Sequence, residues 1–371
     1  MAAQETYIFA GGGTGGHLYP AIALAQELKN RRPHAEVHFV GTRRGIEHRV
    51  IPEHGFPLHL ITVRGVARRL FLRNLVVPFV LLWSLAQCAV LMRRLRPAVV
   101  VGTGGYVSGP VLWMATVMRI PTLIQEQNSY PGATTRLLAP RVDRVHLSFE
   151  ESKLYFKKTE NLLVTGNPVR HFDMSGSPAT ARQAFHLDPE RPTVLVFGGS
   201  QGARAINTAL LDGVKELLQL SDAQIIWSAG NLDADLMERQ TQSMRQRIWT
   251  HAFIRDMATA YRAADVVVAR AGALTLAELT VCGLPSILIP LPTAAANHQM
   301  TNAQALQVKG AARVIPQNEL TPEVLREHIL QLLADDTTRQ LMAEAARDAA
   351  FPQATEDIVD SIEHIARTLE E

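Results

Sequence analysis

The sequence predicts an α/β protein built from two doubly wound, Rossmann-like domains that face each other across a cleft. Short apolar runs such as Val266–Val268 have the length of buried strands, and glycine-rich turns followed by helical segments come directly after them. The chain has 371 residues, more than one hydrophobic core usually supports. We expect a first domain at 1–170, a second at 171–354, and a C-terminal helix at about 355–371 that packs back on the first.

The composition is that of a globular protein with an apolar tendency. Hydrophobic residues make up 47% and charged residues 19%, and the formal charge of +2 gives no support for a nucleic-acid partner. Cys88 and Cys282 are the only cysteines, which excludes a disulfide framework and a CxxC zinc motif. The N-terminus has no basic region followed by an apolar stretch, so we expect a cytoplasmic protein.

The first glycine-rich turn follows the expected strand Thr6–Ala10 and precedes an expected helix at Ala21–Arg31. Its pattern, GxGxxG, occurs in dinucleotide-binding proteins. The second strand, Glu36–Val40, is followed by Gly-Thr-Arg-Arg with no acid to hold an adenine ribose, which disfavours NAD and leaves NADP open. His17 stands at the helix start, where the helix dipole favours a neutral base, although a structural histidine is the alternative.

Further glycine-rich or polar turns follow other expected strands. Gly102–Pro110 follows the strand Ala98–Val101, and Glu-Gln-Asn follows the strand Pro121–Gln125. In the second half, Gly198–Ala203 joins a strand to a helix and is suited to a diphosphate. Ligands of doubly wound sheets bind at these carboxyl ends of the strands.

The stretch from Val266 to Asn302 predicts a strand, a helix at Leu274–Cys282 and a second strand at Ser286–Pro290. The helix start offers unpaired N–H groups to an anion. Glu278 is the one acid of this helix; it is either a surface residue or a carboxylate that accepts two ribose hydroxyls. The polar cluster that follows suits a sugar or caps the next helix, and it comprises His298, Gln299 and Asn302.

Two segments have competing interpretations. Leu75–Met92 is uncharged, and arginines flank it at positions 64, 68, 69, 73, 93, 94 and 96. A membrane-spanning helix would separate strands of one sheet, so we favour a helix with one face in the core and the other on an anionic membrane surface. Asp233-Ala-Asp235 has the DxD pattern of some metal sites, but acids are also favoured at a helix start, and we expect no metal there.

Seven motifs, in order, resemble those of the MurG family of UDP-N-acetylglucosamine:N-acetylmuramyl-(pentapeptide) pyrophosphoryl-undecaprenol N-acetylglucosaminyltransferases. They are GGGTGGHLYPAIALA, GTGGYVSGP, QEQN, GNPVR, VFGGSQGARAIN, RAGALTLAEL and HQMTNA. The resemblance covers nearly the whole chain. It implies the GT-B fold and inverting transfer of N-acetylglucosamine from UDP-GlcNAc to the 4-hydroxyl of the muramyl sugar of lipid I, giving lipid II. It also implies a peripheral enzyme on the cytoplasmic face of the inner membrane, without a cofactor.

The resemblance also implies residue roles. Glu278 would hold the UDP ribose, Ile254 would present its backbone to uracil, and Ser200 would contact the diphosphate. The nucleotide and the α-phosphate would meet Ala273, Leu274, Thr275, Leu276 and Ala277, and the donor sugar would meet His298, Gln299 and Asn302. Across the cleft, the donor would be reached by Thr14, Gly15, Gly16, Asn128 and Arg170. His17 and Tyr106 are the candidates beside the reacting hydroxyl, with His17 the first choice as general base.

Two other classes of function remain to be weighed. An NADP-dependent oxidoreductase would use the first glycine turn, but it would leave the glycine turns of the second half and the apolar segment unexplained. A non-catalytic, membrane-peripheral protein that binds sugar nucleotides would retain the binding residues without turnover.

Overall fold

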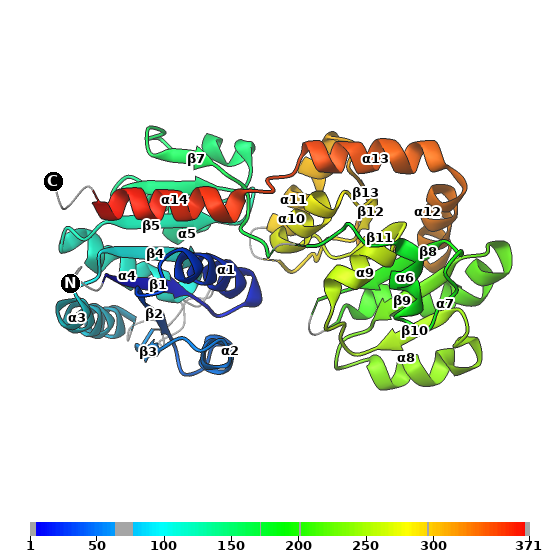
Figure 1. Ribbon diagram of the computed structural model, residues 1–371, viewed down its shortest axis with the longest axis horizontal. Coiled ribbons are helices and arrows are strands. Elements are labelled where there is room, and N and C mark those ends of the chain that lie inside the picture. The colour runs from blue at the N-terminus through cyan, green and yellow to red at the C-terminus, as the bar shows by residue number, and fades with distance from the viewer. Residues whose placement is uncertain (1–4, 64–76, 171, 200–201, 295–296, 368–371) are drawn as a thin grey trace. The chain divides into compact units, whose positions relative to one another are not determined.

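The computed structural model describes residues 5–63, 77–170, 172–199, 202–294 and 297–367. The chain forms two compact units, the first from Met1–Arg170 with Pro352–Glu371 and the second from His171–Phe351. Each unit has one parallel sheet with helices on both faces, and each is described by itself (Figure 1).

The first unit has a seven-stranded sheet in the order β3-β2-β1-β4-β5-β6-β7. Its strands are β1 (Thr6–Gly11), β2 (Glu36–Gly41), β3 (Leu58–Leu60), β4 (Val99–Gly104), β5 (Thr122–Glu126), β6 (Arg144–Leu147) and β7 (Leu162–Val164). Its helices are α1 (Gly15–Arg31), α2 (Glu47–Glu53), α3 (Val77–Leu95), α4 (Gly105–Val117), α5 (Ala133–Leu138), the 3₁₀ helix η2 (Glu150–Tyr155) and α14 (Ala354–Arg367). The order reverses between β1 and β4, so the turns after these two strands lie next to each other.

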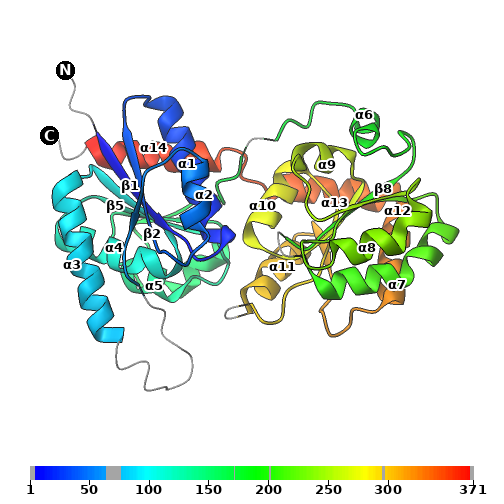
Figure 2. The ribbon, with the colours of Figure 1, turned by 90° about the horizontal axis from the view of Figure 1, so that it is seen from below.

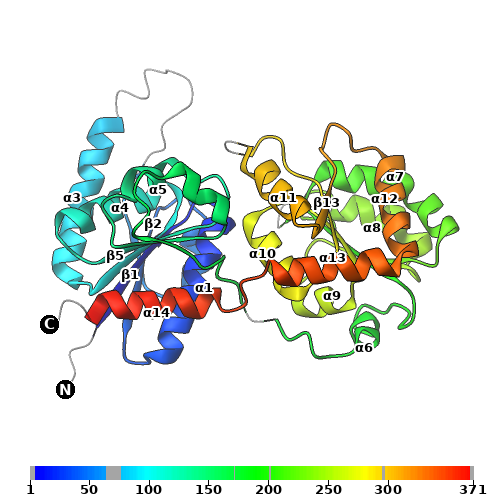
Figure 3. The same ribbon diagram turned by 90° about the horizontal axis from the view of Figure 1, so that it is seen from above.

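Alternate side chains of β1 enter two separate cores. Tyr7 and Phe9 pack with α1, α2 and α14, whereas Ile8 and Ala10 pack with α3, α4 and α5. The C-terminal helix α14 contacts α1 (Figure 3) and buries Ile358 and Ile362 in the first of these cores. Helix α14 therefore completes the core of the unit that contains β1.

Helix α3 is buried along one narrow stripe. Ser84, Cys88 and Met92, spaced four residues apart, are its buried side chains, as expected for one helical face. Leu91 and Leu95 are partly buried beside this stripe. Other large apolar side chains of the helix are exposed: Phe79, Leu81, Leu82, Trp83 and Val90. The helix lies at the outside of the first unit (Figure 2). The prediction of one core face is confirmed, and the prediction that the other face contacts a membrane stays a prediction.

The second unit has a six-stranded sheet in the order β10-β9-β8-β11-β12-β13. Its strands are β8 (Thr193–Phe197), β9 (Gln224–Ser228), β10 (Ile248–His251), β11 (Val266–Ala269), β12 (Ser286–Leu288) and β13 (Ala312–Val314). Its helices are α6 (Pro178–Gln183), α7 (Arg204–Leu220), α8 (Ala234–Thr241), the 3₁₀ helix η3 (Gln242–Met244), α9 (Met257–Ala263), α10 (Ala273–Cys282), α11 (His298–Val308), α12 (Pro322–Ala334) and α13 (Asp336–Asp348). Helices α7, α8 and α12 cover one face, and α9, α10 and α11 cover the other (Figure 2).

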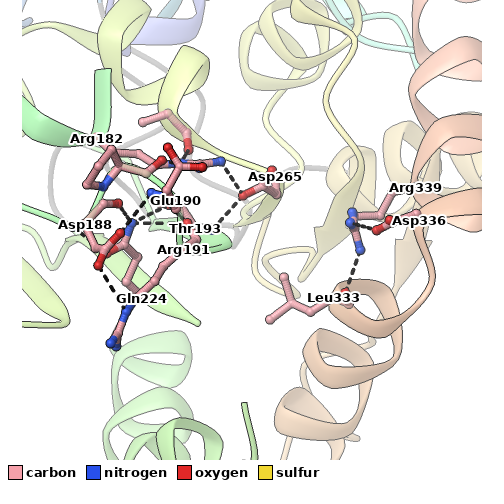
Figure 4. Close-up of polar contacts among 12 residues, drawn as sticks. Arg182, Asp188, Glu190, Arg191, Thr193, Gln224, Asp265, Leu333, Asp336 and Arg339 are labelled. Carbon is pink, nitrogen blue, oxygen red and sulfur yellow. Dashed lines mark hydrogen bonds and ion pairs between the residues drawn. The ribbon is translucent and has the colours of Figure 1, made fainter. Parts of the chain in front are cut away.

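A polar network ties together the strand starts of the second sheet (Figure 4). Arg182, largely buried, donates from Nη2 to Asp265 Oδ2 at 2.9 Å, and the same oxygen accepts the Thr193 N–H at 2.7 Å. Gln224 donates from Nε2 to Thr193 Oγ1 at 3.0 Å. This network connects the N-terminal ends of the strands, and the glycine turns follow their C-terminal ends.

Three expected boundaries are wrong. Helix α1 begins at Gly15 instead of Ala21, so the glycine turn itself forms the start of the helix. Strand β10 ends at His251, three residues before the expected Ile254, and β12 ends at Leu288 because only Ser286–Leu288 pair with β13. In the two strands the paired backbone is shorter than the apolar run, since buried loop residues are also apolar.

Candidate active site

The first glycine turn places His17 beside the turn that follows β4. His17 lies in the first turn of α1, and its Nδ1 is 3.2 Å from Thr14 Oγ1. Its backbone carbonyl accepts the Thr103 hydroxyl at 2.7 Å. If Nδ1 carries the ring hydrogen and donates it to Thr14, then Nε2 has the lone pair that a general base requires.

The turns after β1 and β4 touch through their backbones. Gly105 has φ +79°, and a Cβ there would collide with Gly12 O. Gly104 lies against the His17 ring, because a Cβ at Gly104 would be 2.7 Å from His17 Cδ2. Tyr106 follows at the start of α4 with 67% of its surface exposed. His17 and Tyr106 are therefore presented by two adjacent turns at one edge of one sheet.

The next strand end presents Asn128 through a buried carboxylate. Glu126 Oε2 accepts the Thr135 hydroxyl at 2.6 Å and the Gly132 N–H at 3.0 Å, and its Oε1 accepts the Asn128 N–H at 3.2 Å. Glu126 is 4% exposed, so it serves as the anchor of this loop. Asn128 is half-buried at the loop's start.

In the second unit, α10 begins directly after β11. The first bond within this helix runs from the Leu276 N–H to Gly272 O, so the N–H groups of Ala273, Leu274 and Thr275 precede it. Thr275 is half-buried, while Ala273 and Leu276 are buried. This helix start is the type of backbone site that binds a phosphate group.

Glu278, half-buried on α10, has a hydrogen-bond partner within the second unit. The Tyr261 hydroxyl, from α9, donates to Glu278 Oε2 at 2.6 Å. The Tyr261 side chain is fully buried, with edge-on ring contacts to Phe172 and Phe197. A rigid tyrosine thus orients one carboxylate oxygen, and an oriented carboxylate suits a pair of vicinal hydroxyls.

A cavity of ≈ 580 Å³ adjoins the end of β10, and Ile254, Phe253 and Asp256 are among its lining residues. The Ile254 side chain is 2% exposed. A volume of this size is in the range of small-ligand pockets. The loop around Ile254, which we expect to present its backbone to uracil, therefore borders this cavity.

The polar cluster expected around the donor sugar lies at the start of α11. Gln299 Oε1 accepts the Leu291 N–H at 2.9 Å, which fixes the side-chain amide against the loop after β12. His298 is half-buried and Asn302 is fully buried.

The candidate residues fall into two groups that the structure places on separate units. The first unit carries Thr14, Gly15, Gly16, His17, Tyr106, Asn128 and Arg170, and the second carries Ile254, Ala273, Leu274, Thr275, Leu276, Ala277, Glu278, His298, Gln299 and Asn302. Ser200 lies outside the described residues. Arg170, which is exposed, is the last residue of the first segment of unit one.

Sequence reasoning missed three residues that hold these loops. Tyr261 is the partner of Glu278. Arg270 donates to Ile289 O at 3.0 Å and to Gln317 Oε1 at 2.7 Å, and burial lowers the pKa of its guanidinium. Glu47 binds the first glycine turn. Only Arg270 lies within a quoted motif, and no spacing rule links the other two to their targets.

The DxD pattern has a structural explanation. Asp233 precedes α8, and its Oδ2 accepts the Asn207 side-chain amide at 2.8 Å. Asn207 in turn accepts the Trp227 indole N–H at 3.0 Å. Within the described ranges, no group of three or more His, Cys, Asp or Glu side chains is arranged to hold a metal ion.

Comparison with protein families identifies both units. The Glycosyltransferase family 28 N-terminal domain matches residues 7–147, and the Glycosyltransferase family 28 C-terminal domain matches residues 193–358.

The chain is 47% identical over 363 residues to the UDP-N-acetylglucosamine–N-acetylmuramyl-(pentapeptide) pyrophosphoryl-undecaprenol N-acetylglucosamine transferase of Chlorobaculum parvum, covering 96% of this chain and 98% of the relative. It is 41% identical to the enzyme of the same name from Acetivibrio thermocellus, covering 97% and 98%.

Solved structures agree with the sequence matches. MurG of Acinetobacter baumannii superposes with a TM-score of 0.78 at 30% identity, covering 97% of this chain and 99% of that one. The calicheamicin glycosyltransferase CalG4 superposes with a TM-score of 0.68 at 15% identity, covering 99% and 100%, which indicates the shared GT-B fold alone. The chain therefore belongs to glycosyltransferase family 28 and, within it, to the MurG family of N-acetylglucosamine transferases.

Proposed function

We propose that this glycosyltransferase transfers N-acetylglucosamine from UDP-GlcNAc to the 4-hydroxyl of the muramyl sugar of lipid I, with inversion, and so forms lipid II. The observation that carries the proposal is Glu278, oriented by Tyr261 on a helix whose start suits a phosphate. The relatives that share this sequence are named for the same donor sugar and lipid-linked acceptor.

The second unit binds the donor. The Glu278 carboxylate accepts the two ribose hydroxyls, and the loop at Ile254 receives uracil beside the ≈ 580 Å³ cavity. The N–H groups at the start of α10 stabilise the negative charge that grows on the departing UDP. His298, Gln299 and Asn302 bind the donor sugar.

The first unit binds the acceptor, whose 4-hydroxyl is the attacking group. His17 Nε2 removes its proton as the bond to the anomeric carbon forms, and Thr14 Oγ1 holds the opposite ring nitrogen at 3.2 Å. Tyr106 is exposed beside this position and orients the acceptor. Thr14, Gly15, Gly16, Asn128 and Arg170 complete the contacts of the donor sugar.

The assay combines labelled UDP-GlcNAc with a short-chain lipid I analogue in EDTA, and product is the disaccharide-lipid. Glu278→Ala raises the KM for UDP-GlcNAc, whereas His17→Ala lowers kcat with little change in KM. Product with magnesium but not with EDTA would bring the Asp233 region back into consideration. UDP and NADPH titrations exclude the oxidoreductase alternative if only UDP binds, and binding without turnover of any lipid acceptor would support the non-catalytic alternative.

The membrane contact is the second part of the proposal. In the described part of the chain, α3 is the one helix whose length and composition would allow it to span a bilayer. Core helices of soluble proteins meet the same two criteria. Strands β3 and β4, which flank α3 in sequence, belong to the same sheet, so spanning would divide that sheet. We propose that α3 lies on the surface of the cytoplasmic leaflet, with apolar side chains such as Phe79 and Trp83 in the lipid and Arg93 and Arg94 at anionic headgroups. The flanking residues Arg64, Arg68, Arg69 and Arg73 lie outside the described residues.

Vesicle binding tests this contact. Replacing Arg93 and Arg94 with Glu weakens binding to anionic vesicles and spares turnover of a soluble acceptor. Replacing two exposed arginines of the second unit, Arg239 and Arg245, with Glu changes the net charge equally and is the control. Equal vesicle binding by the Arg93/Arg94 variant and the wild type would remove α3 from the membrane contact.

A further inference from the structure

One buried carboxylate in the first unit has no part in the mechanism described so far. Glu47, in the first turn of α2, is 0% exposed. Its Oε2 accepts the Gly13 N–H at 2.9 Å, and its Oε1 accepts both the N–H and the hydroxyl of Thr42 at 2.9 Å. Glu47 thus joins the glycine turn after β1 to the loop after β2.

Both loops leave room for this carboxylate by lacking side chains. A Cβ at Gly12 would lie 2.6 Å from Glu47 Cδ, and Cβ atoms at Gly41 or Gly45 would overlap the Glu47 side chain. Gly12 lies in the turn after β1, Gly41 ends β2 and Gly45 lies in the loop that follows, and a single side chain explains glycine at all three positions. Because three glycines make room for it, the Glu47 contact is a specific feature of this fold.

Glu47 is ionised without a cationic partner within the part of the chain that the structure describes. Burial alone would raise its pKa, but the hydrogen bonds from Gly13, from its own backbone and from Thr42 outweigh burial and hold the pKa below its ordinary value. A buried carboxylate is costly to desolvate, and here N–H and O–H donors compensate it. The ionised form therefore persists at neutral pH and binds the turn firmly.

The turn depends on this contact because its own capping is weak. Thr14 is the N-cap residue of α1, yet its hydroxyl makes no capping bond to the helix and lies 3.2 Å from His17 Nδ1 instead. Gly13, immediately before it, has φ +82°, a region in which glycine moves freely. The bond from Gly13 to Glu47 fixes the backbone one residue before Thr14.

We infer that Glu47 is a positioning residue for the acceptor half of the reaction. It fixes Gly13, and through Gly13 it sets the Thr14 hydroxyl and the ring of His17 that the hydroxyl contacts. It also occupies the Gly13 N–H, so an acceptor group at this turn meets the N–H groups of Thr14 and the residues after it. This inference rests on the proposed function, in which His17 acts on the acceptor hydroxyl.

The test is Glu47→Gln, which keeps the size of the side chain and removes its charge. A carboxamide has one acceptor oxygen, so its NH₂ group faces either the Gly13 or the Thr42 N–H and one contact is lost. We expect kcat to fall about tenfold to a hundredfold, since small displacements of a reacting group cost that much. The affinity for UDP and the KM for UDP-GlcNAc, which depend on the second unit, stay unchanged.

The matched control is Glu53→Gln, because Glu53 is an exposed acid on the same short helix. Its kcat equals that of the wild type. If Glu47→Gln fails to fold, Thr42→Val takes its place. It removes one hydrogen bond to Glu47 and the acceptor of the Gly45 N–H, and it lowers kcat two- to threefold.

The Gly13 amide proton, assigned by NMR, separates positioning from general stability. In the wild type it resonates downfield because it donates to a carboxylate; in Glu47→Gln it shifts upfield, while the amides of the second unit stay in place. Unchanged kcat with a shifted Gly13 signal would overturn the inference. So would a loss of activity that only follows the unfolded fraction seen by thermal melting. If the wild type itself fails to turn over the lipid I analogue, the proposed function fails, and the Gly13 signal still reports on the contact.

Discussion

The hydrogen bond between Tyr261 and Glu278 predicts a measurable loss of nucleotide affinity when the tyrosine hydroxyl is removed. The O–O distance is 2.6 Å, and the Tyr261 side chain is fully buried. Hydrogen bonds to charged groups contribute roughly 1.5–3 kcal/mol. Part of this free energy is recovered when the freed carboxylate is hydrated, so we expect Tyr261→Phe to cost about 1 kcal/mol of UDP binding, or about fivefold in Kd.

Isothermal titration calorimetry with UDP measures the effect in Tyr261→Phe, Glu278→Gln and the double variant. Because the hydroxyl acts through Glu278, the double variant binds UDP no more weakly than Glu278→Gln alone. Tyr7→Phe is the matched control: the Tyr7 hydroxyl also donates to a carboxylate oxygen, of Glu5, at 2.6 Å, but in the first unit. Additive losses in the double variant, or an unchanged Kd in Tyr261→Phe, would refute the reasoning.

Three further predictions concern pH, stability and the paired glycine turns. His146 is fully buried, and burial lowers its pKa to about 4. The free energy of unfolding therefore keeps its full contribution from His146 above the unfolded-state pKa of about 6.5, and it falls by about 3 kcal/mol as the pH drops to 4. In urea titrations, His146→Asn removes this part of the pH dependence. Asp265→Asn breaks the ion pair with Arg182 and lowers the free energy of unfolding by about 3 kcal/mol, measured by chemical denaturation, with turnover intact at low temperature. Gly105→Ala collides with Gly12 O and lowers kcat more than tenfold while the UDP Kd stays constant; a kcat near that of the wild type would show that the two turns can separate without cost.

The sequence predicted the architecture because its signals are local. Apolar runs marked both parallel sheets, and glycine turns marked the strand ends where ligands bind. Helix α3 was predicted with one buried face, and Ser84, Cys88 and Met92 form that face. These features depend on the order of neighbouring residues, which a single chain displays.

The contacts that hold the candidate site could not be predicted, because they join residues far apart in the chain. Glu47 binds Gly13 over a separation of 34 residues, and Tyr261 binds Glu278 from a different helix. The sequence suggested ribose hydroxyls as partners of Glu278 and gave no indication of Tyr261. Gly45 is a further example. A side chain there would overlap Glu47, so glycine is required by a contact that the local sequence pattern does not indicate.

The return of α14 to the first unit has a consequence for synthesis on the ribosome. Domains usually fold in the order in which they emerge. Here the core face around Phe9 is completed by Ile358 and Ile362, which are made after every segment of the second unit. The second unit can therefore reach its native state while the first still exposes an apolar surface, which leaves the nascent first unit as the part that most needs a chaperone.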